Sequence, residues 1–415
     1  MWYATTWCSY WIIFSYEIMN SNLYEVTAMM TEKSNVSARK TIRVGLIGHQ
    51  FMGIAHSNAF RNAAAMYPVP CKVEMTAVCA QDTPENLQAF ADKFGWQSIE
   101  TDWQKLVARK DIDLISVAAP GFLHKPIVLE ALKHGKHVLC EKPLANNLAD
   151  AAEMAAAALK AGVRHCCGYS YRSTPAQALA QRFVQEGKIG RIYQVHARYA
   201  QDWIVDPNFA MVWRFDKAKA GSGSLGDICA HSIDATRFIT GLEFTEVIGN
   251  LVTLIGERPL DGKNPNGPKG KVTVDDVAQF LCRFNNGATG CFEATRFATG
   301  RKNHNCIEIN GEKGSLYWDF EEQNYLYYYD RTRPAPEQGF SKINATQDAH
   351  PYGGGPWPVG HGIGYGDTFM IEIANFLTAI AKGEEFHPDF NDGLAAQKVL
   401  DAVERSANER KWVRV

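Results

Sequence analysis

From about residue 41 to residue 168, short apolar runs alternate with segments whose apolar residues recur at helical spacing. Runs such as IRVGLIG and IDLISVAAP do not alternate strictly with polar residues, which is typical of parallel strands covered on both faces. Pro84 suits a helix start and Gly95 a helix end. The pattern predicts a doubly wound parallel sheet, the Rossmann arrangement of an α/β fold. We expect strands at residues 42–48, 72–80, 112–120, 136–143 and 163–170, and helices from about residue 52 and at 83–95, 102–110, 124–135 and 148–162.

In the second half of the chain, strands follow one another without helices between them. VAQFLCRF and ATGCFEATRF flank Asn286-Gly287, which is a strong hairpin signal. A second hairpin is expected to turn between Asn310 and Gly314. Such a succession predicts a large, open and mostly antiparallel sheet with helices on one face. Near the C-terminus, DTFMIEIANFLTAIAKG has apolar residues at helical spacing and is expected to be a core helix.

The chain is expected to divide into three parts. Residues 41–168 form the Rossmann domain, and residues 169–415 form an α+β domain for substrate binding and oligomerisation. The opening MWYATTWCSYWIIFSYE is apolar and aromatic, but it lacks the basic leader of a signal peptide and reaches Glu17 too early for a membrane span. We expect residues 1–40 to be a poorly ordered extension, or to belong to an upstream start that is not normally used.

Composition excludes several classes of function. The apolar fraction of 46% is ordinary, and a net charge of −2 provides no basic stripe for nucleic acid. No stretch approaches the roughly 20 apolar residues that span a bilayer, so no membrane partner is expected. The ten cysteines include no Cys-x-x-Cys, and Cys166 and Cys167 are adjacent, which is awkward for a disulfide framework. This usage favours a reducing cytoplasm.

The first predicted strand ends on a variant of the dinucleotide-binding fingerprint G-x-G-x-x-G. Gly48 and Gly53 are its first and last glycines, but Gln50 replaces the middle one. Because Gly48 lies where a strand turns into a helix, it can form the tight turn, and Gly53 can allow close packing of helix and strand. Gln50 must then point away from the phosphates or bind them.

The end of the second strand usually carries the acid that binds the adenosine ribose of NAD. Ala80 occupies that place, followed by Gln81 and Asp82, and no arginine beside it would receive a 2′-phosphate. The sequence leaves NAD and NADP open, and we favour NAD.

Two further stretches carry candidate chemistry. CEKPL places Lys142 at the carboxyl end of a strand, where such sheets bind ligands, and Pro143 is a candidate for a cis peptide. Asp227, His231 and Asp234 are spaced by four and three residues, which predicts one helix face. Asp227 is also a candidate helix cap and His231 a candidate core residue. We expect no metal, because a site here would have two carboxylates and no further His or Cys nearby.

In this order, GLIGxxxMGxxH, EKPL and GDxxxHxxD resemble the glucose–fructose oxidoreductase, inositol dehydrogenase and MocA family from about Ile42 to the C-terminus. The resemblance implies Lys142, Asp227 and His231 as the catalytic set. It also implies cofactor contacts from Gly48, Gln50, Phe51, Met52, Gly53, Ala80, Pro120, His124, Glu141, Lys142 and Arg172. Gly121 departs from the family pattern, which has asparagine there. The family uses the open sheet face as its subunit interface, which implies a homodimer or homotetramer.

A site with Lys, Asp and His suits the oxidation of a secondary hydroxyl in a polyhydroxylated ring. Histidine suits the base, and lysine can stabilise charge that develops on oxygen. We therefore expect a pyranose sugar, glycoside or cyclitol, and the region is similar to the levoglucosan dehydrogenase branch, which oxidises carbon 3 of pyranoses. Candidate substrate contacts are Gln201, Asp202, Trp203, Trp213, His361 and Tyr365. The tryptophans can equally be core residues.

Two other functions stay open at this point. The fold also supports glycoside hydrolases that retain NAD and act through transient oxidation of the sugar. A non-catalytic sensor of cofactor redox state is the other, although a sensor would not need Lys142, Asp227 and His231. Fold alone does not separate these functions.

Overall fold

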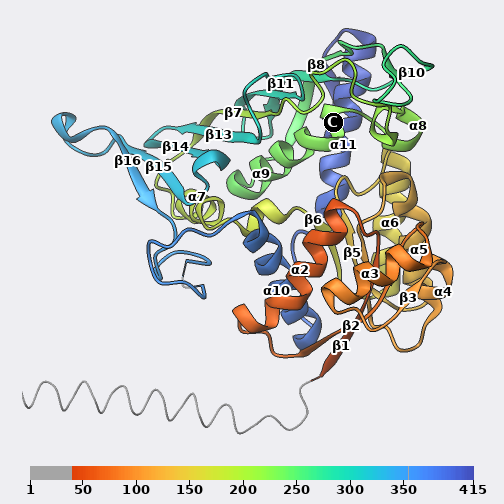
Figure 1. The fold of residues 1–415 in the computed structure, drawn as a ribbon. Coiled ribbons are helices and arrows are strands. Elements are labelled where there is room, and N and C mark those ends of the chain that lie inside the picture. Colours follow the sequence, from red (N-terminus) through yellow and green to blue (C-terminus); the bar gives the residue numbers. More distant parts are fainter. Residues whose placement is uncertain (1–39, 354) are drawn as a thin grey trace, which may run out of the picture. The chain divides into compact units, whose positions relative to one another are not determined.

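The computed structural model describes residues 40–353 and 355–415, and these contain two large sheets (Figure 1). The prediction for residues 1–40 falls, apart from Lys40, outside the described residues. Over residues 40–353 and 355–415, no helix is both long and apolar enough to cross a membrane.

The first sheet has six strands in the order β3-β2-β1-β4-β5-β6, and the parallel sheet predicted from the alternating pattern is confirmed. β1 pairs in parallel with β4, β4 with β5, and β5 with β6. The strand order reverses between β1 and β4, and open α/β sheets bind their ligands at the carboxyl edge beside such a switch point. The strands are β1 (Thr41–Ile47), β2 (Lys72–Cys79), β3 (Ile99–Glu100), β4 (Leu114–Val117), β5 (His137–Glu141) and β6 (His165–Gly168).

Helices connect these strands, and their ends follow local chemistry. Thr83 caps the second of them by accepting the Asn86 N–H, Pro84 begins it, and Gly95 ends it in the left-handed conformation with φ 86°. Strand β3 was not predicted, because two residues have no periodicity. The helices are α2 (Phe51–Met66), α3 (Pro84–Phe94), α4 (Trp103–Ala108), α5 (His124–Lys133) and α6 (Leu148–Ala161).

The second sheet has nine strands in the order β16-β15-β14-β13-β7-β12-β11-β8-β17. Both predicted hairpins are confirmed, as β11 with β12 and β13 with β14, and only the described pair β12 with β7 is parallel. The strands are β7 (Ile192–Ala200), β8 (Phe244–Val252), β11 (Val277–Phe284), β12 (Thr289–Thr295), β13 (His304–Gly311), β14 (Gly314–Asp319), β15 (Tyr325–Asp330), β16 (Phe340–Asn344) and β17 (Val413–Arg414), and a separate ribbon joins β9 (Glu257–Pro259) to β10 (Lys269–Lys271).

One face of the second sheet is covered by helices. Inward residues alternate along β11, and Phe280 stacks on Phe292 with ring centroids 4.7 Å apart. Helices α7, α9 and α11 pack on this face. The helices of this part are α7 (Pro175–Gln185), α8 (Lys217–Ala220), α9 (Ala230–Thr240), α10 (Tyr365–Lys382) and α11 (Phe390–Glu409).

The last two helices return to the first sheet. α10 packs along α2, and α11 contacts both α6 and β8 (Figure 1). Phe369 and Phe376 of α10 share one buried cluster with Val44 of β1. The predicted boundary at residue 168 therefore separates the two sheets along the chain, but the C-terminal helices cross it in space.

Replacing Phe376 by Ala tests this packing. Its side chain is fully buried, so we expect the free energy of unfolding to fall by about 3–5 kcal/mol in chemical denaturation. Leu159→Ala is the control, since Leu159 is 77% exposed on α6 and should change stability by under about 0.5 kcal/mol. Equal effects of the two changes would contradict the shared core.

Candidate active site

The turn between β1 and α2 needs both of its glycines. Gly48 has φ +110°, and a Cβ there would lie 2.4 Å from the Ala118 carbonyl oxygen of the neighbouring strand end. A Cβ on Gly53 would lie 2.2 Å from the Gly48 carbonyl oxygen. The tight turn and the close packing predicted for these positions are therefore present.

Gln50 leaves the start of α2 open. It is exposed at the N-cap position, makes no side-chain cap, and its amide contacts the His49 ring at 3.2 Å. The first turn of this 16-residue helix carries no acidic residue. Free N–H groups at a helix start favour an anion, so the turn fits the pyrophosphate of a dinucleotide despite the missing glycine.

An acidic side chain lies beside this turn, although the sequence count placed none there. The Asp82 carboxylate is 2.8 Å from Nε2 of His49, which belongs to the glycine turn. Hydrogen bonds from Asn86, from the Thr83 N–H and from His49 lower the pKa of Asp82. The count stopped at Ala80, the buried residue after β2, and missed Asp82 because the chain bends at residues 81 and 82.

Gly121 and His124 shape the loop after β4. A Cβ on Gly121 would lie 2.4 Å from the Asn146 side-chain oxygen, so Asn146 occupies the space that a larger residue would need. His124 is buried, with Nε2 2.9 Å from the Ala119 carbonyl oxygen and Nδ1 3.1 Å from that of Pro143. The ring thus joins the β4 loop to the turn after β5. The cofactor contacts predicted for Pro120 and His124 stay predictions.

A buried hydrogen-bonded chain lies behind Lys142. The His56 ring is 2.7 Å from the Ser116 hydroxyl and 2.9 Å from the Glu141 carboxylate. The other Glu141 oxygen accepts the Lys142 N–H at 3.1 Å. The peptide between Lys142 and Pro143 is cis, as proposed from the sequence.

Lys142 reaches from the first sheet to Asp227. Its Nζ donates to the Asp227 backbone carbonyl at 2.6 Å and lies 3.5 Å from Oδ1 of the same residue. The other carboxylate oxygen is 3.6 Å from Arg296. Burial opposes ionisation here, but Lys142 and Arg296 hold the pKa of Asp227 below its usual value.

The segment that carries Asp227 is capped from elsewhere. Leu225–Cys229 forms a π-helical turn before α9. The Asp275 carboxylate accepts the N–H groups of Gly223 and Leu225 at 2.7 and 2.8 Å, and the Ser224 hydroxyl at 2.7 Å. Asp275 therefore acts as the cap that was one alternative for Asp227, and the Asp227 carboxylate faces Lys142 and Arg296.

His231 lies half-buried in an aromatic surrounding. Its ring centroid is 4.6 Å from that of Tyr171 and 6.0 Å from that of Tyr199. Burial and the charge of Lys142 hold the pKa of His231 well below 6.5, against the opposite effect of Asp227. The imidazole is therefore neutral at neutral pH and able to accept a proton.

Asp234 does not pair with Lys142 or Asp227; its partner is Arg172. Its carboxylate accepts the Arg172 Nε–H at 2.8 Å, and Arg172 also lies 3.2 Å from Asp392 of α11. His231 and Asp234 both lie in the regular helix α9, and the Asp234 carboxylate is bound by Arg172 instead of Lys142. Arg172 is buried and engaged by these two carboxylates, so the geometry gives no support to its predicted contact with a cofactor.

Among the predicted substrate contacts, Gln201 and Trp203 are engaged within the protein, and Trp213 is half-buried. The Gln201 amide accepts from the Trp203 indole at 3.1 Å and donates to Asn303 at 2.8 Å, so its polar atoms are engaged within the protein. Trp203 stacks on Phe215 in a small apolar cluster, as expected of a core tryptophan. Trp213 is half-buried, and the Arg214 guanidinium lies 4.5 Å from its ring centroid.

Tyr365 lies among aromatic rings near the start of α2, whereas His361 is exposed. Tyr365 begins α10, and its ring lies 6.4 Å from Tyr171 and 6.0 Å from Phe51 at the start of α2. His361 is exposed, and its ring contacts the Pro358 carbonyl oxygen at 2.9 Å. Among the described contacts, none joins His361 to Lys142. Asp202 binds Lys302 at 2.7 Å and the Gly300 N–H at 3.0 Å.

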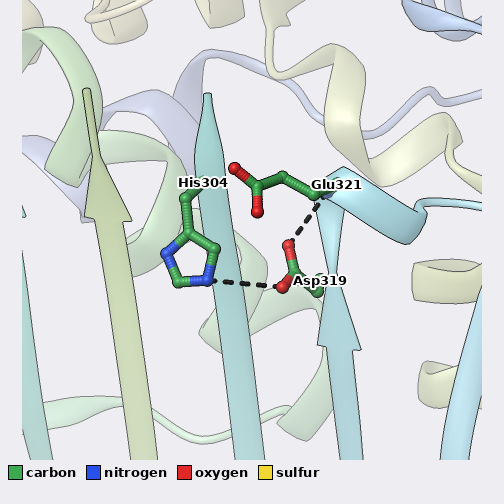
Figure 2. Close-up of side chains that lie close together, drawn as sticks. All are labelled: His304, Asp319 and Glu321. Carbon is green, nitrogen blue, oxygen red and sulfur yellow. Dashed lines mark hydrogen bonds and ion pairs between the residues drawn. The ribbon is translucent and has the colours of Figure 1, made fainter. Parts of the chain in front are cut away.

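Another set of potential metal ligands lies on the second sheet. Figure 2 shows His304, Asp319 and Glu321, whose candidate atoms lie within 4.8 Å of one another. Asp319 also accepts the Glu321 N–H at 2.9 Å and the Tyr317 hydroxyl at 3.1 Å, and Glu321 pairs with Arg301. These contacts account for the arrangement, so we assign it no ligand.

The fold and this site define a class: an α/β oxidoreductase with a dinucleotide-binding parallel sheet followed by a large, mostly antiparallel sheet. Residues 42–169 match the oxidoreductase family with an NAD-binding Rossmann fold, and residues 178–317 match the C-terminal domain of the same family. The chain belongs to the glucose–fructose oxidoreductase, inositol dehydrogenase and MocA family, as its motifs indicated.

Named relatives cover nearly the whole chain. Levoglucosan dehydrogenase of Pseudarthrobacter phenanthrenivorans is 41% identical over 390 residues, which are 91% of this chain and 98% of the relative. An oxidoreductase domain protein from Kribbella flavida has a solved structure with 50% identity and a TM-score of 0.87, covering 91% of this chain and 99% of its own. A levoglucosan dehydrogenase complex with NADH and L-sorbose has 41% identity, the same TM-score of 0.87 and the same coverage.

Nuclear magnetic resonance can test the electrostatics of His231. We expect its ring to titrate below pH 6.5, because burial and Lys142 disfavour the cation. Lys142→Met should raise this pKa, and Asp227→Asn should lower it. The protein has twelve histidines, so the signal of His231 must first be assigned. The signal that is missing from the spectrum of His231→Gln identifies it. A midpoint at or above 6.5 in the unaltered protein would refute the assigned environment.

Proposed function

We propose that the protein is a dehydrogenase that transfers hydride from a secondary hydroxyl of a pyranose sugar, glycoside or cyclitol to NAD. The observation that carries the proposal is the meeting of Lys142, Asp227 and His231 at the carboxyl end of β5, within the family whose name includes sugar and cyclitol oxidoreductases. This edge of the sheet also holds the glycine turn of β1.

The chain's own residues fit a nicotinamide dinucleotide. The open start of α2 and the turn at Gly48 would hold its pyrophosphate, and the loop from Pro120 and the turn at Lys142 would flank its nicotinamide half. When bound, the nicotinamide would supply the acceptor for hydride. The proposed contacts from Phe51, Met52, Ala80 and Glu141 follow from the family pattern.

His231, Lys142 and Asp227 would divide the remaining work. The neutral His231 imidazole would take the hydroxyl proton. The Lys142 ammonium would donate a hydrogen bond to the same oxygen and stabilise the charge that develops there. Asp227 would hold Lys142 in place and bind a neighbouring hydroxyl.

The named relatives and two aromatic side chains, Trp213 and Tyr365, support a sugar ring as substrate. The relative with 41% identity is named for levoglucosan, and its solved complexes contain levoglucosan or L-sorbose with NADH. Here Trp213 and Tyr365 are half-buried; the charge of Asp227 acts on Tyr365, and Trp213 contacts Arg214, which acts on Asp227. Both rings offer flat surfaces for the apolar face of a pyranose. We therefore place levoglucosan first among the substrates to test.

The open face of the second sheet supports the homodimer or homotetramer implied by the family. Leu281 of β11 points away from the helices and is 49% exposed, and Phe340 of β16 is 53% exposed. Apolar residues on an uncovered sheet face favour association of subunits.

The assay that tests this function mixes the protein with NAD or NADP and a panel of levoglucosan, other pyranoses, glycosides and inositols. We expect reduced nicotinamide to appear, seen by its near-ultraviolet absorbance. His231→Ala should lower turnover by about 10²–10⁴-fold, because general-base catalysis is lost. His134→Gln is the control, because His134 is exposed at the end of α5, and it should turn over at the unaltered rate.

A loss below tenfold in His231→Ala would rule out the assigned base. If no reduced nicotinamide appears across the panel but glycosides are cleaved, the hydrolase that uses transient oxidation replaces the dehydrogenase. Denaturing the purified protein and finding retained nicotinamide would then support that alternative.

The preference for NAD is supported by the ionised Asp82 beside His49. A carboxylate at this place accepts a ribose hydroxyl and repels a 2′-phosphate. Asp82→Asn should raise the ratio of kcat/KM for NADP to that for NAD by about fivefold or more, the equivalent of ~1 kcal/mol for an exposed charge. Asp92→Asn, which neutralises an exposed acid on the same helix α3, should leave the ratio unchanged. An unchanged ratio in Asp82→Asn would remove Asp82 from cofactor selection.

A further inference from the structure

Arg296 is a fully buried cation beside the charged group. It follows β12 and is 0% exposed. Its Nη2 donates to the Asp275 carbonyl at 3.2 Å, and its guanidinium lies 5.5 Å from the centroid of the Trp203 ring. Within residues 40–353 and 355–415, its Nε and Nη1 have no hydrogen-bond partner. A buried guanidinium is costly unless nearby charge compensates it.

That compensating charge is Asp227. Arg296 Nη1 lies 3.6 Å from Oδ2 of Asp227, and Lys142 Nζ lies 3.5 Å from Oδ1. Each carboxylate oxygen thus faces one cation. Both distances exceed those of charge-assisted hydrogen bonds, so the carboxylate lies between the two cations without being fully bound to either.

We propose that Arg296 is a positioning residue that holds the Asp227 carboxylate away from a closed ion pair with Lys142, so that the ammonium can donate to the substrate oxygen. The inference rests on the proposed function, in which Lys142 binds that oxygen. Without Arg296, the carboxylate has a single close cation and would rotate onto Lys142. The ammonium would then lose a donor direction that the substrate needs.

Arg296 also contacts Asp275, the residue that holds the backbone turn of Asp227. Asp275, whose carbonyl binds Arg296, is the residue that caps the turn before α9. A Cβ on Gly223 would lie 2.7 Å from Arg296 Nη2 and 1.6 Å from the Asp275 carbonyl oxygen. Arg296 therefore contacts both the backbone support and the carboxylate of Asp227.

Other charges near Asp227 do not substitute for Arg296. The groups that act on its carboxylate are Lys142, Arg296, Arg214 and His231, and those whose ionisation it opposes include Tyr199 and Tyr365. Arg214 lies against the Trp213 ring, and His231 is neutral at neutral pH. Arg296 and Lys142 alone form ion pairs with Asp227 among the described residues.

The test compares Arg296→Gln and Arg296→Lys with Arg258→Gln. Arg258 is a matched control, because it is also 0% exposed, lies 4.6 Å from the Phe215 ring and donates to backbone carbonyls, but does not pair with Asp227. The assay uses levoglucosan and NAD, with cofactor affinity measured separately by fluorescence titration of NADH. Thermal unfolding identifies variants that do not fold.

We expect Arg296→Gln to lower turnover by about tenfold to a hundredfold with unchanged affinity for NADH. The acid limb of its pH profile should move to higher pH, because Asp227 loses one cation that favours ionisation. Arg296→Lys should also lower turnover, but several-fold less than Arg296→Gln does. The charge remains, but the single donor group of lysine cannot reach both Asp275 and Asp227. Arg258→Gln should reduce the unfolding temperature and leave the pH profile unchanged.

Turnover within twofold of the unaltered protein and an unchanged pH profile in folded Arg296→Gln would overturn the inference. If Arg296→Gln does not fold, full turnover in Arg296→Lys would overturn it instead. The variant Lys142→Ala distinguishes a failure of the inference about Arg296 from a failure of the proposed function. An active Lys142→Ala refutes the proposed function itself, whereas an inactive Lys142→Ala with a fully active Arg296→Gln refutes only the role of Arg296.

Discussion

The contact between Lys142 and Asp227 is the interaction on which the rest of the site depends. Lys142 leaves the end of β5 in the first sheet, and Asp227 belongs to the turn that precedes α9 against the second sheet. A lysine placed in this way brings the carboxyl edge of the parallel sheet to the helix that carries His231. After burial, the charge of the ammonium is the next influence on the ionisation of Asp227 and His231, because it favours the carboxylate and disfavours the imidazolium.

Each side of that contact has its own buried support. Behind Lys142, the chain from Ser116 through His56 to Glu141 binds the Lys142 N–H. Behind Asp227, the Asp275 carboxylate caps the turn. Buried polar groups of this kind are stable only when their partners are present, so they determine where the Lys142 and Asp227 side chains lie.

A separate ion-pair network joins the same parts of the molecule. Arg172, which follows β6, binds Asp234 of α9 and Asp392 of α11. Together with the packing of α10 on α2, it connects the first sheet to the C-terminal helices. Asp234 thus belongs to the packing of the structure, although its spacing in the sequence is the same kind of signal as that of Asp227 and His231.

Local pattern by itself determined the parallel sheet, both hairpins of the second sheet, the helix ends at Pro84 and Gly95, and the glycine turn at Gly48. These features depend on periodicity and backbone conformation, which neighbouring residues set. The family motifs indicated Lys142, Asp227 and His231 as a set. Only the tertiary structure decided that Asp82 meets His49, that Asp275 and not Asp227 caps the turn, that Asp234 pairs with Arg172, and that Arg296 faces Asp227. Each of these joins residues far apart in the chain, and which buried charges pair depends on the packing of whole elements, which no local pattern contains.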